Sequence, residues 1–158
     1  PMHKTVMVGV VALVAFVTLQ SPALGLEKKN YNYSEWTKGI FSEVITVVGP
    51  GKTIYLAGVG AEDEAAARGT VRYKGDFLAQ CLYSYDKIKR LLARHGATLN
   101  DIVKQVTYVT DIRYIGELGK CRNATFGTGP VPTNTLLNIS GLAFPEMMIE
   151  VDVTAVVP

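Results

Sequence analysis

The sequence predicts an α+β domain with the element order ββ-α-β-α-ββ, in which two helices lie on one face of a mixed sheet. Three observations lead to this prediction. Residues 76–95 carry one apolar stripe with helical spacing, and residues 148–156 alternate apolar and polar side chains as a half-buried strand does. Two β-rich runs also flank a Gly-Pro-Gly turn at residues 49–51.

The composition excludes several classes of protein. The chain has 158 residues, of which 48% are hydrophobic, so it can bury one core and is not intrinsically disordered. A net charge of +2 argues against a dedicated nucleic-acid binder, which usually has a strongly basic patch. Two cysteines and two histidines are too few for a zinc cluster or an iron–sulfur centre. We therefore expect no metal site and no nucleic-acid partner.

The first residues have the pattern of a secretory signal. Lys4 precedes residues 6–19, a mostly apolar run that is too short to cross a bilayer, which requires about 20 residues. Ala23-Leu24-Gly25 then supplies small residues at the two positions that a signal peptidase reads. A charged region, an apolar region and a small-x-small site in this order predict a signal peptide.

This pattern sets the expected domain boundaries. Pro1 precedes Met2, so we interpret Pro1 as an added residue and Met2 as the natural start. We expect residues 1–25 to comprise this proline and the signal peptide, and residues 26–158 to form a single domain that is periplasmic or secreted. After removal of the signal we expect no membrane contact. An N-terminal anchor and a helix packed in an oligomer are the alternatives.

The predicted elements begin with a hairpin. Residues 43–48 and 53–57 are β-rich and flank Gly49-Pro50-Gly51-Lys52, whose central Pro-Gly pair is typical of a type II turn. Residues 26–37 show no period and give no element, and residues 60–75 read as a polar loop.

Two helices and a strand follow. The stripe that defines the first helix, residues 76–95, consists of Phe77, Cys81, Tyr85, Ile88 and Leu92. Gly96 ends this helix, and residues 102–110 form a strand. Residues 111–126 form a second helix whose inward residues are expected to be Ile115, Leu118, Cys121 and Phe126.

The two cysteines lie on these helices beside apolar neighbours. Export would permit a disulfide between Cys81 and Cys121. We nevertheless interpret both as buried free thiols, because free cysteine is among the most buried residue types. Neither has a histidine nearby in the sequence, so a cysteine–histidine nucleophile is not expected.

The chain ends in two strands, at residues 134–139 and 148–156. In the last one, Ile149, Val151, Val153 and Ala155 alternate with Met148, Glu150, Asp152 and Thr154. One face of this strand is therefore apolar, and the other carries two carboxylates about 7 Å apart. Such a pair permits acid–base chemistry, although alternate polar residues also mark a solvated sheet face.

Several segments resemble the RidA/YjgF (L-PSP) family. Residues 96–111, GATLNDIVKQVTYVTD, are similar to the family segment GAS-x-DDVVK-x-x-VYLTD, and the likeness continues without gaps to residue 127. Residues 39–44, GIFSEV, resemble GPYSQAV, and residues 54–58, IYLAG, resemble V-Y-V-S-G. With residues 149–152, IEVD, the likeness covers about residues 39–157.

This resemblance implies a fold, an assembly and an activity. The family fold is chorismate-mutase-like and assembles as a homotrimer whose sheets line a central barrel, with small ligands in clefts between subunits. Archetypal members hydrolyse enamine or imine metabolites, such as 2-aminoacrylate, to a keto compound and ammonia without a cofactor. An arginine grips the substrate carboxylate, and a glutamate positions or deprotonates the attacking water.

The family site carries over only in part. Glu150 matches the catalytic glutamate, and Gly58 matches the glycine whose backbone faces the ligand. Asn134, however, stands at the place of the arginine, Phe41 at that of a tyrosine, and Leu136 at that of a cysteine. Losing a charge-assisted hydrogen bond costs about 1.5–3 kcal/mol. These substrate-binding positions therefore predict a cleft that is more apolar than that of the archetypal family members and binds anions less strongly than theirs.

Neighbouring positions follow the same trend. Ala57 and Val59 replace a serine and a glutamine, and Gly119 replaces an asparagine on the second helix. Arg122 stands where the family often has a tyrosine, and it could in principle replace the missing arginine. We expect instead that it extends along the helix surface to solvent, as arginines on helices usually do.

Three functions remain open. The first is hydrolysis of enamines or imines, with Glu150 handling water and Asn134 orienting the substrate. The alternative is a non-catalytic homotrimer that binds a small molecule in a more apolar cleft. The third is an endoribonuclease, which ranks lowest because neither a basic patch nor a histidine pair is present.

Overall fold

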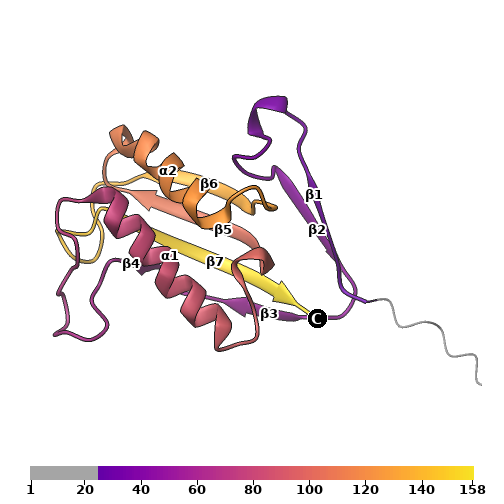
Figure 1. Ribbon diagram of the computed structural model, residues 1–158, viewed down its shortest axis with the longest axis horizontal. Helices are drawn as coiled ribbons and strands as arrows, with labels where there is room; N and C mark the ends of the chain where they lie inside the picture. Colours follow the sequence, from indigo (N-terminus) through magenta and orange to yellow (C-terminus); the bar gives the residue numbers. More distant parts are fainter. Residues whose placement is uncertain (1–24) are drawn as a thin grey trace, which may run out of the picture.

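The computed structural model describes residues 25–158, so the predicted signal peptide lies, except for Gly25, outside the described residues. Two helices pack on a sheet, and a two-stranded ribbon stands beside them (Figure 1). The strands and helices are β1 (Glu27–Tyr31), β2 (Val44–Val48), β3 (Lys52–Tyr55), β4 (Val59–Gly60), α1 (Phe77–Ala93), β5 (Ile102–Val109), α2 (Ile115–Phe126), β6 (Thr133–Asn138) and β7 (Ile149–Val157).

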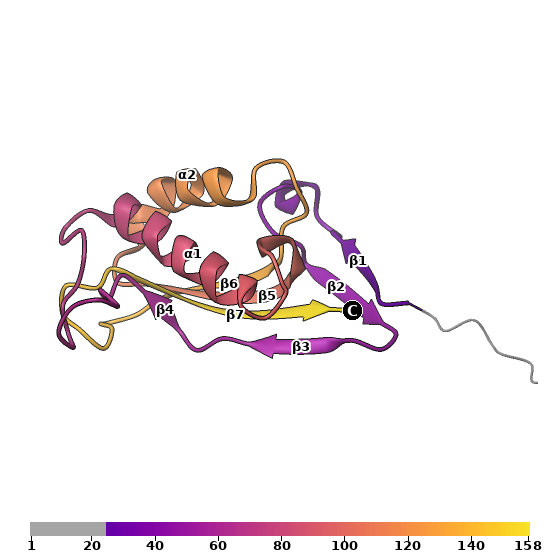
Figure 2. The same ribbon diagram turned by 60° about the horizontal axis from the view of Figure 1, so that its bottom comes forward.

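The main sheet has the strand order β3-β7-β5-β6, and β4 also pairs with β7. β5 and β6 run parallel, whereas all pairings of β7 are antiparallel, so the sheet is mixed. Both helices lie on the same face of this sheet, and its other face carries no helix (Figure 2). The predicted α+β class is therefore confirmed. Among residues 25–158, no helix is both long and apolar enough to span a membrane.

The core lies between α1 and the sheet. The Asp76 side chain accepts a hydrogen bond from the Ala79 backbone N–H and so caps the start of α1. Gly96 has a φ of 76°, which suits the left-handed residue that follows a helix. The residues of the predicted stripe are all buried and pack with the inward face of β7; they are Phe77, Cys81, Tyr85, Ile88 and Leu92.

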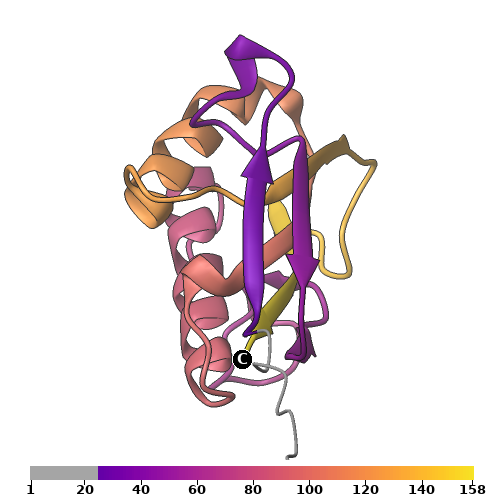
Figure 3. The same ribbon diagram turned by 90° about the vertical axis from the view of Figure 1, so that its right-hand side faces the viewer.

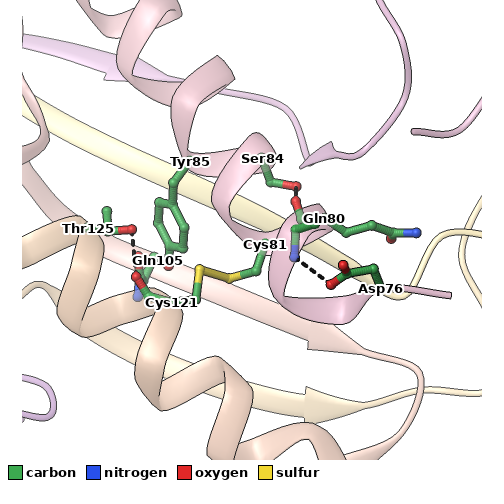
Figure 4. The surroundings of a disulfide bond; sticks show 9 residues. Asp76, Gln80, Cys81, Ser84, Tyr85, Gln105, Cys121 and Thr125 are labelled. Carbon is green, nitrogen blue, oxygen red and sulfur yellow. Dashed lines mark hydrogen bonds between the residues drawn. A yellow bond between two sulfur atoms is a disulfide. The ribbon is translucent and has the colours of Figure 1, made fainter. Parts of the chain in front are cut away.

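The prediction of free thiols is wrong, because Cys81 and Cys121 form a disulfide between α1 and α2 (Figure 4). Their Cα atoms lie 6.2 Å apart, and both side chains are fully buried. The two helices pack side by side, so each stripe turns its cysteine toward the other helix as well as toward the sheet. The bond ties together residues that are 40 positions apart in the sequence.

The predicted hairpin is also wrong. β2 pairs with β1, and β3 pairs with β7, so the two strands flanking the turn belong to different sheets. The residue with positive φ is Gly49, at 96°, whereas a type II turn centred on Pro50 requires it at Gly51. Gly51 instead lies against the end of β7, where a Cβ would come within 2.9 Å of the Val157 carbonyl oxygen.

β1 is an element that the sequence did not predict. Its pairing with β2 makes a two-stranded ribbon, which is seen face-on in front of the main sheet in Figure 3. Both strands are largely exposed, so neither shows the alternation that a buried face would impose. Lys28 ties the ribbon to the body through an ion pair of 2.9 Å with Asp101.

The second helix differs from its prediction at its start. Residues 112–114 form a single 3-10 turn, and the α-helix begins at Ile115. Ile115 is 54% exposed rather than directed into the core, whereas Leu118, Cys121 and Phe126 are buried as expected. The face of α2 that carries Ile115 looks instead toward a cavity.

Candidate ligand-binding site

A cavity of about 580 Å³ lies between α2, β6 and the segment that precedes β2; we call it the α2 pocket. This volume is in the range typical of sites for small molecules. Most of the side chains around it are apolar, and Arg122, Asn123 and Asn134 are its polar residues apart from the indole N–H of Trp36. The pocket therefore offers an apolar enclosure with few polar groups.

One face of α2 forms a wall of this pocket. Its residues stand at positions i, i+3, i+4, i+7 and i+11, which places them on the same side of the helix; they are Ile115, Leu118, Gly119, Arg122 and Phe126. Gly119 has no atom within 4 Å of where a Cβ would be. The replacement of the family asparagine by glycine therefore leaves open space in this wall.

The opposite wall comes from β6. Asn134 and Leu136 line the pocket from two alternate positions, which direct their side chains toward the helices. The Thr107 hydroxyl donates a hydrogen bond of 2.9 Å to Asn134 Oδ1 and so fixes the orientation of the amide. Thr107 is fully buried, whereas Asn134 is half-buried at the pocket wall.

The third wall is the segment that enters β2. Trp36 and Phe41 pack edge to face with ring centroids 5.7 Å apart, and both line the pocket. The Asn32 side-chain amide donates to the Phe41 carbonyl at 2.7 Å and to the Thr37 hydroxyl at 2.7 Å. These bonds hold an irregular segment in place. The pocket therefore contains three of the five predicted site residues, Phe41, Asn134 and Leu136.

Glu150 and Gly58 form a second cluster. A Cβ placed on Gly58 would lie 2.6 Å from Glu150 Cδ and closer still to its Oε1, so the carboxyl group rests directly on the glycine backbone. Burial, followed by the charges of Glu62 and Asp152, raises the pKa of Glu150 above its usual value. A carboxylate with a raised pKa is a stronger base, which suits proton transfer.

The two clusters lie on opposite faces of the sheet. Asn134 shares its face with Thr107, to which it is hydrogen bonded, and Thr107 points toward the helices. Glu150 is paired with Tyr108 and therefore points away from the helices. Within one chain, Glu150 and Asn134 cannot contact the same small ligand.

Asp152 lies on the same face as Glu150. It accepts a hydrogen bond of 3.2 Å from the Tyr108 hydroxyl, which raises the pKa of Tyr108. Its neighbours on this face belong to the sheet itself, and no residue of the α2 pocket is among its hydrogen-bond partners. The structure thus assigns Asp152 a place on the open face and does not bring it to the pocket.

Arg122 is the residue whose position the sequence did not predict. It is only 8% exposed, so the expectation that it reaches solvent is wrong. Burial lowers the pKa of its guanidinium. Trp36 was likewise missed, because it lies in the segment without periodicity. Its place three residues before the family-like stretch at 39–44 is the signal that could have found it.

Comparisons with known proteins agree with this fold. The family profile described as Endoribonuclease L-PSP matches residues 36–157. A RutC family protein from Pyrococcus abyssi is 28% identical over 117 residues, which cover 74% of this chain and 86% of that protein. The residues matched by the family profile include every residue of the two clusters.

Solved structures give the same result. The Rid family protein YyfB from Yersinia pestis, of unknown function, superposes with a TM-score of 0.72 at 25% identity and covers 85% of this chain and 100% of its own. PA3499 from Pseudomonas aeruginosa, also of unknown function, is 31% identical with a TM-score of 0.57, covering 86% and 88%. The resemblance noted in the sequence is confirmed, and it supports a RidA-type function in general terms. The chain therefore belongs to the Rid/YjgF family, whose profile is described as Endoribonuclease L-PSP.

Proposed function

We propose that this protein binds a small, largely apolar molecule in the α2 pocket. The observation that carries the proposal is the cavity of about 580 Å³, whose walls are apolar and which holds Phe41, Asn134 and Leu136. Burial of apolar ligand surface contributes about 25 cal/mol per Å². A ligand with a compact apolar body would therefore gain more from these walls than a short polar metabolite.

The only tryptophan of the chain reports on this pocket, because Trp36 lines it. We expect small aromatic probes, phenylacetate and phenylacetamide, to change its fluorescence in a saturable way. Gly119→Leu places a side chain in the pocket and should abolish the change. Gly116→Leu is the matched control, since Gly116 also lies on α2 with open space around it but does not line the pocket. Equal binding by both variants would contradict the proposal.

Hydrolysis of an enamine or imine is the second candidate, and the position of Glu150 favours it. Water would add to the imine carbon while Glu150 accepts its proton. Transfer of that proton to nitrogen would give a carbinolamine. The carbinolamine hydroxyl would then lose its own proton to the amine as the C–N bond breaks, which leaves a keto compound and ammonia. The raised pKa of Glu150 supports this role. The apolar pocket and the loss of the family arginine weigh against it.

Both candidates are expected to involve a homotrimer. Since Asn134 and Glu150 lie on opposite faces of one sheet, a ligand can contact both only if a second copy brings its own Glu150 to the pocket. Static light scattering of the purified protein tests this assembly. A monomeric mass would rule out a shared cleft and with it the role of Glu150 in the same site as Asn134.

A coupled assay tests the reaction itself. A dehydratase generates 2-aminoacrylate, and the loss of the imine is followed with the parent protein, Glu150→Ala and Asn134→Arg. Acceleration by the parent that Glu150→Ala abolishes would establish the hydrolase. An inert parent with an active Asn134→Arg variant would show a site adapted to another ligand. If all three are inert, hydrolysis of this imine is excluded.

We also propose a periplasmic or secreted location. The Cys81–Cys121 disulfide supports it, because disulfides persist in oxidising compartments and are rare in the cytosol. Fractionation of producing cells, with the mass of the exported chain, tests this location and signal cleavage together. Recovery of the full-length chain in the cytosol with both thiols free would contradict both.

A further inference from the structure

Three buried side-chain atoms in residues 25–158 have no hydrogen-bond partner: Gln105 Nε2, Arg122 Nε and Arg122 Nη2. All three are hydrogen-bond donors, and two belong to a single guanidinium. Buried polar groups in native proteins are nearly always paired, because an unpaired one costs free energy. Residues 25–158 therefore contain buried donors without a partner, and two of the three belong to Arg122.

The other part-buried cations of this chain behave differently. Lys87 forms an ion pair of 2.9 Å with Glu62, and Lys28 forms one of 2.9 Å with Asp101. Arg122 is more buried than either of them, yet it has no ion-pair partner among residues 25–158. The hydroxyl of Tyr85 is the polar group that opposes the lowering of the Arg122 pKa by burial. This hydroxyl is already hydrogen bonded to Gln105 Oε1 at 3.1 Å.

Arg122 faces the α2 pocket. It lies one turn after Leu118 and one turn before Phe126 on the helix face that lines the cavity. On the opposite wall, Asn134 uses its Oδ1 to accept from Thr107, which leaves its amide Nδ2 available to donate. Residues that carry hydrogen-bond donors thus line the pocket on two walls, and most of its other lining side chains are apolar.

From this geometry we infer that Arg122 binds the carboxylate of the ligand in the α2 pocket, with Asn134 Nδ2 as a second donor. The inference rests on the proposed function and specifies its ligand class, a monocarboxylate with an aromatic or branched aliphatic body. The positive charge that holds the carboxylate would then come from Arg122 on α2, and not from position 134 on β6, where the family has its arginine. A carboxylate held from this helix sits beside Leu118 and Phe126, so its body is directed against the apolar walls.

A matched pair of probes tests the inference. Phenylacetate and phenylacetamide have nearly the same shape, but only the first carries a charge at pH 8. Titration followed by Trp36 fluorescence and by calorimetry should show phenylacetate binding about 10- to 200-fold more tightly, the range for one charge-assisted hydrogen bond. Arg122→Gln should remove this preference, so that phenylacetate binds no more tightly than phenylacetamide.

Two further variants separate a specific contact from general charge. Lys120→Gln removes an exposed positive charge from the same helix and should leave the preference for phenylacetate intact. Arg122→Lys keeps the charge but loses the planar two-pronged geometry, so it should retain only part of the preference. The thermal midpoint of each variant shows whether it is folded.

The outcomes are distinguishable. If both probes bind the parent protein equally, the pocket stands and the inference about Arg122 falls. If the preference persists in Arg122→Gln, another group binds the carboxylate and the inference is wrong. If neither probe binds, the proposed function fails, and the inference fails with it.

Discussion

The backbone of Gly58 supports the carboxyl group of Glu150, on the sheet face away from the helices. No side chain fits between them, since a Cβ on Gly58 would lie 2.6 Å from Glu150 Cδ. The two residues belong to different segments, Gly58 to the stretch between β3 and β4 and Glu150 to β7. The glycine is therefore required by its neighbour and not by its own backbone conformation, because its φ is not positive.

This relationship predicts the effect of Gly58→Ala. The new methyl group must displace the Glu150 side chain. Because the displaced atoms are the end of a flexible, half-buried side chain, the cost should lie at or below the lower end of the ~1–3 kcal/mol typical of overpacked cores. Combining it with Glu150→Ala removes the clashing atoms, so the double variant should recover most of this loss. A double-mutant cycle measured by urea unfolding tests the coupling.

Gly141→Ala serves as the control for this cycle. A Cβ on Gly141 meets nothing within 4 Å, and its φ is also not positive. It should therefore change the free energy of unfolding little, or raise it slightly by restricting the unfolded chain. If Gly58→Ala is no more destabilising than Gly141→Ala, the close packing of Gly58 and Glu150 is refuted.

The raised pKa of Glu150 predicts a pH-dependent stability difference. Burial and the charges of Glu62 and Asp152 disfavour the ionised form in the folded state. The contribution of Glu150 to the free energy of unfolding is therefore fully present below its unfolded-state pKa. It is lost as the pH rises through the raised pKa of the folded state. Glu150→Gln should accordingly have a higher Tm than the parent at pH 7, with a difference that vanishes at acidic pH.

Asp63 gives a control of opposite sign. A hydrogen bond from Arg72 lowers the pKa of Asp63. The contribution of Asp63 to the free energy of unfolding is therefore present above its usual pKa and is lost as the pH falls through the lowered pKa. Asp63→Asn should therefore lower the Tm at pH 7 and have no effect at strongly acidic pH. Thermal melts of the two variants between pH 3 and pH 8 should show differences of opposite sign.

Arg122 should reduce the stability of the protein without ligand. A buried charge with unpaired donors costs at least about 1 kcal/mol, so Arg122→Met should raise the Tm by roughly 3–6 °C. Lys87→Met is the comparison, because Lys87 is paired with Glu62 at 2.9 Å and its loss should lower the Tm. A lower Tm for Arg122→Met would mean that the guanidinium is satisfied in the folded protein.

The helices and the last strands could be predicted because their patterns are local. The stripe from Phe77 to Leu92 and the alternation along β7 each reflect burial of one face. The hairpin could not, since the choice of partner for β2 and β3 depends on β1 and β7, which lie far away in the sequence. β1 is exposed on both faces and carries no periodic signal.

Candidate site residues could be named from the family pattern, but their arrangement in space could not be predicted. The family pattern points to Asn134 and Glu150. Which face of the sheet each side chain lies on follows only from the register of β5, β6 and β7, which the sequence does not show. The burial of Arg122 depends on how α2 is rotated against α1 and on the segment that carries Trp36. The spacing of apolar residues within α2 does not reveal how the helix is rotated against α1.

The disulfide between Cys81 and Cys121 should contribute substantially to stability. Closing a loop of about 40 residues stabilises a fold by about 4 kcal/mol in the chain-entropy treatment, and removal of native disulfides costs about 2–5 kcal/mol. The chain has only two cysteines, so any effect of a reductant on urea unfolding reports this bond alone. We expect dithiothreitol to lower the unfolding midpoint of the parent and to leave the Cys81→Ala/Cys121→Ala variant unchanged. A thiol titration of the untreated, urea-unfolded protein should find no free thiol, and finding two would show that the helices are not cross-linked.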